Sequence, residues 1–349
     1  MVLASGHRAP SLVQTVLHQF LGLFLSRCRR SEPIQNKLVG GPMYDVSVII
    51  PVVSKSSRLA RTREVVRRLQ EQRAIALEII IVMQGFDETE TIGIDGVKTI
   101  FSRVFSSSHS RNVGACHATA DLISFLDDDT YPAASDFYRR VKTILDVGAV
   151  DFVTCNIVSN GKRLAASRIE SDVQINRQTI IGNMWEPGLT LRRKTFLKFQ
   201  FDATLGIGAI HGSGEGFDLG ARLVDAGLKG KRLAGLEIDH PPLPLNSEFD
   251  VQRTFYYSLG NGSSLVARGF HKAYAKQLFK QVAKTVLYPC LNRWSEAKLA
   301  LLRLACLLIG PAIPRGVPKI IPNQLAKDLI DGEIDPFPKV EPRIDRATA

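Results

Sequence analysis

The stretch Leu122-Ile123-Ser124-Phe125-Leu126-Asp127-Asp128-Asp129 decides the fold, because a mainly apolar run leads directly into three carboxylates. Nearly continuous apolar runs are typical of strands that are covered on both faces. Two similar runs precede it, at residues 46–51 and 77–82, with a helical pattern between them at residues 65–69. Strand, helix and strand in this order predict a parallel βαβ unit. We therefore expect an α/β domain with a mostly parallel sheet flanked by helices.

The alternation continues along the chain. We expect a weak strand at 97–101, a helix at 108–120, a strand at 152–157, a helix at 214–226 and a strand at 233–238. In open α/β sheets, ligands bind beyond the carboxyl ends of the strands. The residues at these ends are therefore the first candidates for a binding site: Pro51, Val52, Gln84, Asp127, Asp128 and Asp129.

The composition limits the class of protein and the kind of partner that we expect. A chain of 349 residues with 45% hydrophobic residues can bury a sizeable core. The formal charge of +11 suits an anionic partner such as nucleic acid, lipid headgroups or a phosphorylated substrate. The five cysteines form no C-x-x-C pair, which favours a reducing, cytosolic compartment. The apolar stretch 12–25 precedes its basic cluster instead of following it, so we expect no secretory signal. No apolar run is long enough to cross a bilayer, so we expect no spanning helix.

Three regions are predicted: an N-terminal amphipathic helix and linker at 1–44, the α/β domain at 45–245, and a basic helical C-terminal region at 246–349. In the last region, lysines recur every four residues and share one stripe of a helix: Lys272, Lys276, Lys280 and Lys284. Such a basic amphipathic helix is typical of the interface of an anionic membrane. The alternative is a solvated lysine edge on a helix that packs against the domain.

The three consecutive aspartates raise one another's pKa unless a cation or a set of donors neutralises them. A divalent cation, Mg²⁺ or Mn²⁺, would take Asp127 and Asp129 as oxygen ligands and fill its other positions with the phosphates of a nucleotide diphosphate. The alternative is a helix N-cap, with Asp129 or Thr130 capping a helix that begins near Pro132.

Four segments, V-S-V-I-I-P-V (46–52), L-E-I-I-I-V (77–82), S-R-N-V-G-A (110–115) and I-S-F-L-D-D-D (123–129), resemble the family 2 glycosyltransferases of the GT-A fold in order and spacing. The resemblance implies an inverting transferase in which Pro51 begins the nucleotide pocket. It also implies that Arg111 and Asn112 border the donor and that Asp127 to Asp129 bind metal and diphosphate. The resemblance extends over roughly residues 45–242.

Further residues follow from the same resemblance. Glu215 and Asp218 open a helix that resembles the family's acidic acceptor-site helix, and they are the candidate bases for the acceptor hydroxyl. His240 follows a strand where many members place a metal-binding histidine. Two departures stand out. Gly216 replaces a carboxylate that commonly follows the glutamate, and Gln84 ends the second strand where an aspartate pair often contacts the nucleobase.

Together these observations predict a metal-dependent glycosyltransferase of the hexosyltransferase type. It would move a sugar from a nucleoside-diphosphate sugar to a saccharide or lipid-linked acceptor in the assembly of a cell-surface polysaccharide or glycolipid. We expect it in the cytoplasm, peripherally associated with the inner face of the membrane, and without a nucleic-acid partner, because few aromatic residues are present for stacking. The alternatives are a catalytically silent binding protein, favoured by Gly216, and a nucleotidyltransferase.

Overall fold

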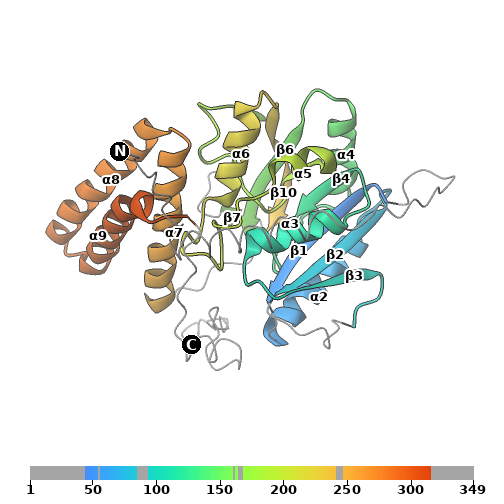
Figure 1. The fold of residues 1–349 in the computed structure, drawn as a ribbon, viewed down its shortest axis with the longest axis horizontal. Coiled ribbons are helices and arrows are strands. Elements are labelled where there is room, and N and C mark those ends of the chain that lie inside the picture. Colours follow the sequence, from blue (N-terminus) through green and yellow to red (C-terminus); the bar gives the residue numbers. More distant parts are fainter. Residues whose placement is uncertain are drawn as a thin grey trace, which may run out of the picture. The chain divides into compact units, whose positions relative to one another are not determined.

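The computed structural model describes residues 44–53, 56–84, 93–159, 162–163, 168–240 and 247–315 (Figure 1). All of them belong to one compact unit, Pro42–Ala349. The predicted N-terminal helix and almost all of its linker lie outside the described residues, as does the chain beyond residue 315.

The first half of the unit is the predicted parallel βαβ arrangement. Strands β2, β1 and β4 pair in parallel, with β3 added parallel to β2 at the edge. Helices α2 and α3 connect them. The bounds are β1 (Val46–Val53), α2 (Ser56–Gln70), β2 (Leu77–Gln84), β3 (Val97–Ser102), α3 (Ser107–His117) and β4 (Leu122–Phe125).

The second half extends the same sheet, and the described residues contribute ten strands in all. The order is β3-β2-β1-β4-β9-β6-β10-β5, with β7 beside β6 and β8 beside β10. Strand β9 is antiparallel to β4 and β6, so β4 and β6 still point the same way. The bounds are β5 (Tyr131–Pro132), α4 (Phe137–Asp146), β6 (Phe152–Ser159), β7 (Lys162–Arg163), β8 (Val173–Ile175), β9 (Thr190–Arg192), α5 (Arg193–Phe199), α6 (Glu215–Asp225) and β10 (Gly230–Asp239).

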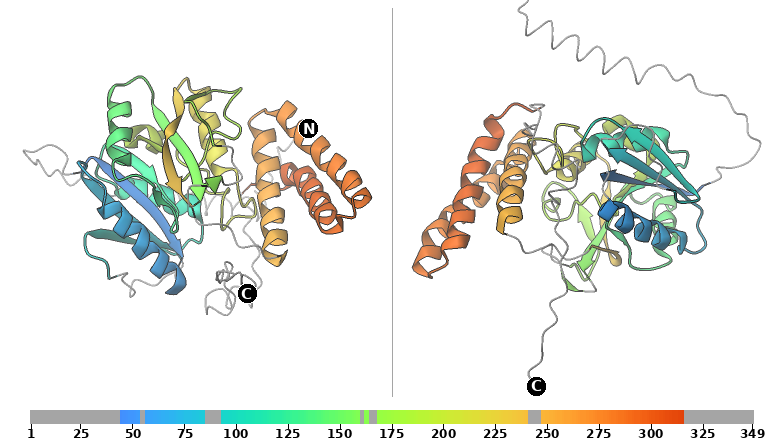
Figure 2. Two further views of the ribbon diagram at one scale, coloured as in Figure 1. Left: turned by 180° about the vertical axis from the view of Figure 1, so that it is seen from behind. Right: turned by 90° about the horizontal axis from the view of Figure 1, so that it is seen from below.

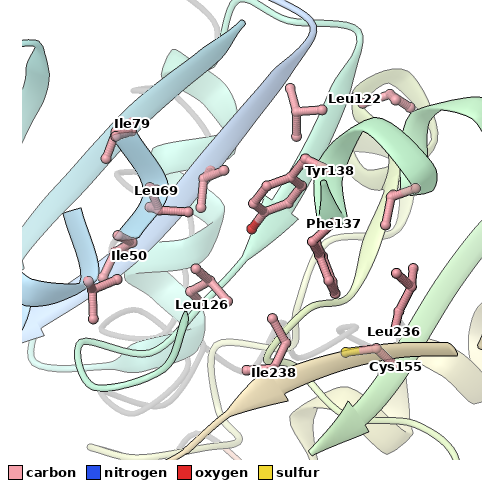
Figure 3. Packing of buried hydrophobic residues seen from close by; sticks show 14 of the residues in the cluster. Ile50, Leu69, Ile79, Leu122, Leu126, Phe137, Tyr138, Cys155, Leu236 and Ile238 are labelled. Atoms are coloured by element: carbon pink, nitrogen blue, oxygen red, sulfur yellow. The ribbon is translucent and has the colours of Figure 1, made fainter. Parts of the chain in front are cut away.

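Two apolar cores cover the two faces of the sheet. Alternate residues of β1 divide between them: Val48 and Ile50 face the core formed with α2 and α4, whereas Ile49 faces the core formed with α3, α5 and α6. Figure 3 shows the first core, in which Phe137 and Tyr138 of α4 pack close to residues of the sheet. Burial on both faces explains why these strands are almost continuously apolar.

Three long helices, α7 (Ser247–Ala267), α8 (His271–Cys290) and α9 (Trp294–Ile309), form the C-terminal region and confirm its predicted helical character. Helix α9 packs against both α7 and α8, and Figure 2 shows α8 and α9 side by side. Buried His211, in the loop before α6, contacts the carbonyl oxygen of Gly310 through Nε2 at 3.0 Å. The helices are therefore attached to the α/β domain by specific polar contacts.

Candidate active site

The acidic run lies directly beyond the carboxyl end of β4. Leu126 donates its N–H to the carbonyl oxygen of Ile49, and the chain then turns, with the Asp127 N–H donating to Thr130 Oγ1 at 2.9 Å. After the turn comes strand β5, which pairs with β10, and helix α4 begins only at Phe137. The alternative interpretation of the run as the cap of a helix that begins near Pro132 is therefore wrong.

Two arginines neutralise the run. Arg58 of α2 contacts Asp128 at 2.6 Å and Asp129 at 3.7 Å, and Arg111 of α3 contacts Asp127 at 2.5 Å. Arg111 was predicted to border the site, whereas no pattern in the sequence singled out Arg58. The three aspartates thus share two guanidinium groups, one from each face of the sheet.

Burial dominates the protonation of this cluster. It raises the pKa of Asp128 to about 7, against the opposing effect of Arg58. Burial also raises the pKa of Asp129, which the charge of His240 lowers and the charge of Asp127 raises further. His240, immediately after β10, donates its backbone N–H to Val158. Its charge acts on Asp129, and its role as a metal ligand stays a prediction.

Helix α3 is held firmly against the sheet. Ser106 caps it by accepting the N–H of His109, and a Cβ at Gly114 would lie 2.4 Å from Ile49 Cγ2, so only glycine allows this close approach. Asn112 uses both ends of its amide on the backbone of Phe201, at 2.9 Å each. These hydrogen bonds hold the loop after α5 in place, and the contact of Asn112 with a donor stays a prediction.

The other predicted donor residues lie at the carboxyl ends of β1 and β2. Pro51 is opposite Val82 and Val53 is opposite Gln84, so β1 runs two residues beyond the proline. Val52 and Gln84 are buried. The sheet thus brings these strand ends to the same edge as the aspartates, as expected for parallel strands.

Helix α6 supplies the two predicted bases, in different surroundings. Glu215 is buried, and its Oε1 lies 3.5 Å from Arg111. Burial, followed by the charge of Glu186, raises the pKa of Glu215 to about 8. Glu186, in the loop before β9, was not predicted as a site residue. It accepts the backbone N–H of Gly216 at 2.6 Å, and burial raises the pKa of its carboxyl against the opposing charge of Arg111.

Asp218 is fully buried and contacts three arginines. Its carboxylate lies 2.9 Å from Arg222, 2.7 Å from Arg268 and 3.3 Å from Arg315. Arg268 follows α7 and Arg315 follows α9, so this carboxylate joins the helical region to the α/β domain. This geometry favours Glu215 over Asp218 among the two predicted bases.

A family model described as glycosyl transferase family 2 matches residues 47–204. Residues 47–204 form a family 2 glycosyltransferase domain. The match contains the acidic run, Arg111 and Glu186, and the mostly parallel sheet is the GT-A type arrangement that the resemblance implied. Glu215, Asp218 and His240 lie beyond its end, so the family model covers less of the chain than the predicted resemblance.

No curated protein sequence matches the chain. Among solved structures, it is similar to TarS 1–349 of S. aureus, with 13% identity over 76% of this chain and 90% of that one, at a TM-score of 0.47. The same protein in complex with UDP-GlcNAc matches at 14% identity, over 62% of this chain and 66% of that one, at a TM-score of 0.45. The similarity covers 54% of the longer TarS chain, over 76% of this one, with 14% identity and a TM-score of 0.46.

Proposed function

We propose that the glycosyltransferase domain transfers a sugar from a nucleoside-diphosphate sugar to a hydroxyl of a saccharide or lipid-linked acceptor. The observation that carries this proposal is the pairing of Asp127 with Arg111, and of Asp128 with Arg58, at the carboxyl end of β4. Arginines at this edge of the sheet suit the charge of a diphosphate leaving group. Carboxylates beside them suit a cation that bridges to the same phosphates.

The donor set fits Mg²⁺ or Mn²⁺. Asp127 is the most exposed of the three aspartates, with 32% of its side chain accessible, against 10% for Asp128 and 14% for Asp129. In the described part of the chain, no three His, Cys, Asp or Glu side chains form a complete metal set. A cation held by Asp127 and Asp129, with His240 nearby, would therefore complete its shell with donor phosphates and offset their charge.

Nucleotide-dependent thermal stabilisation tests this proposal. We expect one of UDP, GDP, dTDP or CMP to raise the melting temperature in the presence of Mn²⁺, and the rise to disappear in Asp129→Ala. Asp136→Ala, in an exposed ion pair with Arg139, is the matched control and should respond as the wild type does. A wild-type protein that responds to none of these nucleotides, with or without metal, would contradict the proposal.

We further propose that helices α8 and α9 lie on an anionic membrane surface, where the domain would assemble a cell-surface polysaccharide or glycolipid. None of the described helices is long and apolar enough to cross a bilayer. However, large apolar side chains of α8 and α9 are exposed, including Phe279 at 75%, Val286 at 67% and Trp294 at 60%. Lys276 and Lys280 are exposed on the same side of α8 as Phe279.

This arrangement differs from a solvated lysine edge, in which the neighbouring apolar residues would pack inward. On α9, Trp294, Leu301 and Leu308 recur every seven residues and are all more than half exposed. Exposed apolar residues at this spacing along one face suit an interaction surface. The adjacent lysines favour anionic lipid as the occupant.

Liposome flotation tests the membrane proposal. We expect binding to vesicles that contain phosphatidylserine and much weaker binding to vesicles of phosphatidylcholine alone. The double variant K276E/K280E should lose at least about tenfold in affinity for the anionic vesicles, since each basic residue near the surface contributes about 1 kcal/mol. Lys229→Glu, which is exposed on the α/β domain, is the charge-matched control. Equal binding to both vesicles would contradict the electrostatic part.

A further inference from the structure

Glu186 occupies the space that a side chain at position 216 would fill. A Cβ built on Gly216 would lie 2.2 Å from Glu186 Oε1 and 2.7 Å from its Cδ. No real Cβ tolerates such distances, so a side chain at 216 would require the carboxylate of Glu186 to leave its observed position. Glycine at this position of α6 is therefore a condition for the observed place of Glu186.

Glu186 and Glu215 share the charge of Arg111. Arg111 is almost completely buried, and its other carboxylate partner is Asp127. The charges of all three carboxylates act on its guanidinium, so one cation faces three acids. Burial raises the pKa of both glutamates, and the protons that they retain belong to the pair as a whole.

The hydrogen-bond geometry favours the charged form of Glu186 within the glutamate pair. Its carboxylate accepts the N–H of Gly216 in the first turn of α6, where unpaired backbone donors and the helix dipole favour an anion. Burial raises the pKa of both carboxyls: at Glu215 the charge of Glu186 adds to it and the pKa reaches about 8, whereas at Glu186 the charge of Arg111 and the N–H of Gly216 oppose it. The two carboxyls therefore differ in their capacity to accept a further proton.

We propose that Glu186 is the proton acceptor for the acceptor hydroxyl and that Gly216 admits it to this position. The inference rests on the proposed function. As the hydroxyl oxygen bonds to the anomeric carbon, its proton passes to the carboxylate of Glu186. The bond between the anomeric carbon and the diphosphate oxygen breaks, and the nucleoside diphosphate leaves with the electron pair, next to the charge of Arg111.

Paired glutamine variants separate Glu186 from Glu215. Glu186→Gln removes the proton acceptor and should lower kcat about 100-fold or more. Glu215→Gln imitates the protonated state of Glu215 and should lower kcat at least about tenfold less than Glu186→Gln does. Release of nucleoside diphosphate is measured with UDP-N-acetylglucosamine, UDP-glucose and GDP-mannose, with Glu170→Gln, an exposed glutamate, as control. The reverse order of the two losses would overturn the inference.

A second set of variants tests the shared space. Gly216→Ala should displace Glu186 and lower kcat by as much as Glu186→Gln does, whereas the double variant E186Q/G216A should lose no more than either single change. The double variant E186A/G216E places a carboxylate in the same space from position 216. Its kcat should be at least about tenfold higher than that of Glu186→Gln. Additive losses, together with no recovery in E186A/G216E, would overturn the inference.

Nucleotide-dependent thermal stabilisation is recorded for every variant. We expect it to match the wild type in Glu186→Gln and Gly216→Ala, because neither residue contacts the acidic run directly. If the wild type binds and releases nucleotide and Glu186→Gln is fully active, this inference is overturned and the proposed function is not. A wild-type protein that neither binds a nucleotide nor turns over any of the donors overturns the proposed function.

Discussion

Carboxylates and arginines meet in opposite ratios at two places in this protein. Asp218 is one carboxylate that contacts three guanidinium groups, whereas Arg111 is one guanidinium acted on by Asp127, Glu186 and Glu215. A carboxylate with three cationic partners is fixed in place by them. Burial raises the pKa of Glu186 and Glu215, which share one guanidinium, so their charge responds to any ion that enters. The first group joins two parts of the fold, and the second suits chemistry.

Removing the charge of Asp218 should have the largest effect. Asp218→Asn keeps the shape of the side chain but leaves Arg222, Arg268 and Arg315 without their shared anion. We expect a loss of about 3 kcal/mol in the free energy of unfolding, because breaking a buried ion pair from one side leaves uncompensated charge. Urea unfolding measures it.

Asp225→Asn, in an exposed ion pair with Arg177, serves as the control and should cost less than about 1 kcal/mol. Unchanged unfolding of Asp218→Asn would mean that the three arginines do not depend on this carboxylate. The contrast between the two groups would then be lost.

The sequence predicted the acidic group better than its partners. The apolar run before Asp127 placed the aspartates at the carboxyl end of a strand because its pattern is local, and the family resemblance placed Arg111 beside them. Arg58 meets Asp128 across 70 residues, and no local pattern records such a pairing. Only the topology brings α2 and β4 together.

Glu186 was missed for a related reason. It lies in a loop, where side-chain direction does not follow from periodicity, and 30 residues separate it from Gly216. The available signal was the departure at position 216, which we interpreted as a lost carboxylate. The structure instead has a carboxylate from another segment in the same space. The observation that favoured a catalytically silent protein thus has a second explanation.

The shared charge of Arg111 should give a distinctive pH dependence. The pKa of Glu215 is raised to about 8, so between about pH 4.5 and pH 8 the folded protein retains a proton that the unfolded chain has lost. Stability therefore falls as pH rises through this window. We expect the free energy of unfolding of Glu215→Gln to fall less over this pH range than that of the wild type, by on the order of 2 kcal/mol. Urea unfolding with a chelator present measures it. Parallel curves for variant and wild type would contradict a retained proton.

An exposed carboxylate with two arginine partners should have the smallest effect. Glu64 contacts Arg67 and Arg68, and the hydrogen bond from Arg67 is the largest cause of its lowered pKa of about 2. Because these side chains face solvent, we expect Glu64→Gln to cost less than about 1 kcal/mol in thermal unfolding, and less still in high salt. A loss as large as that of Asp218→Asn would show that the number of partners, and not burial, sets the difference.

The contact between Gly216 and Glu186 has a consequence for the history of such chains. If Glu186 is the proton acceptor, we expect a side chain at 216 to lower activity while Glu186 is present, and loss of Glu186 to lower it while 216 is glycine. The two positions are therefore expected to covary among related sequences, with an acid at one of them and rarely at both. What lineages would preserve is a carboxyl group at one point in space, whichever segment carries it.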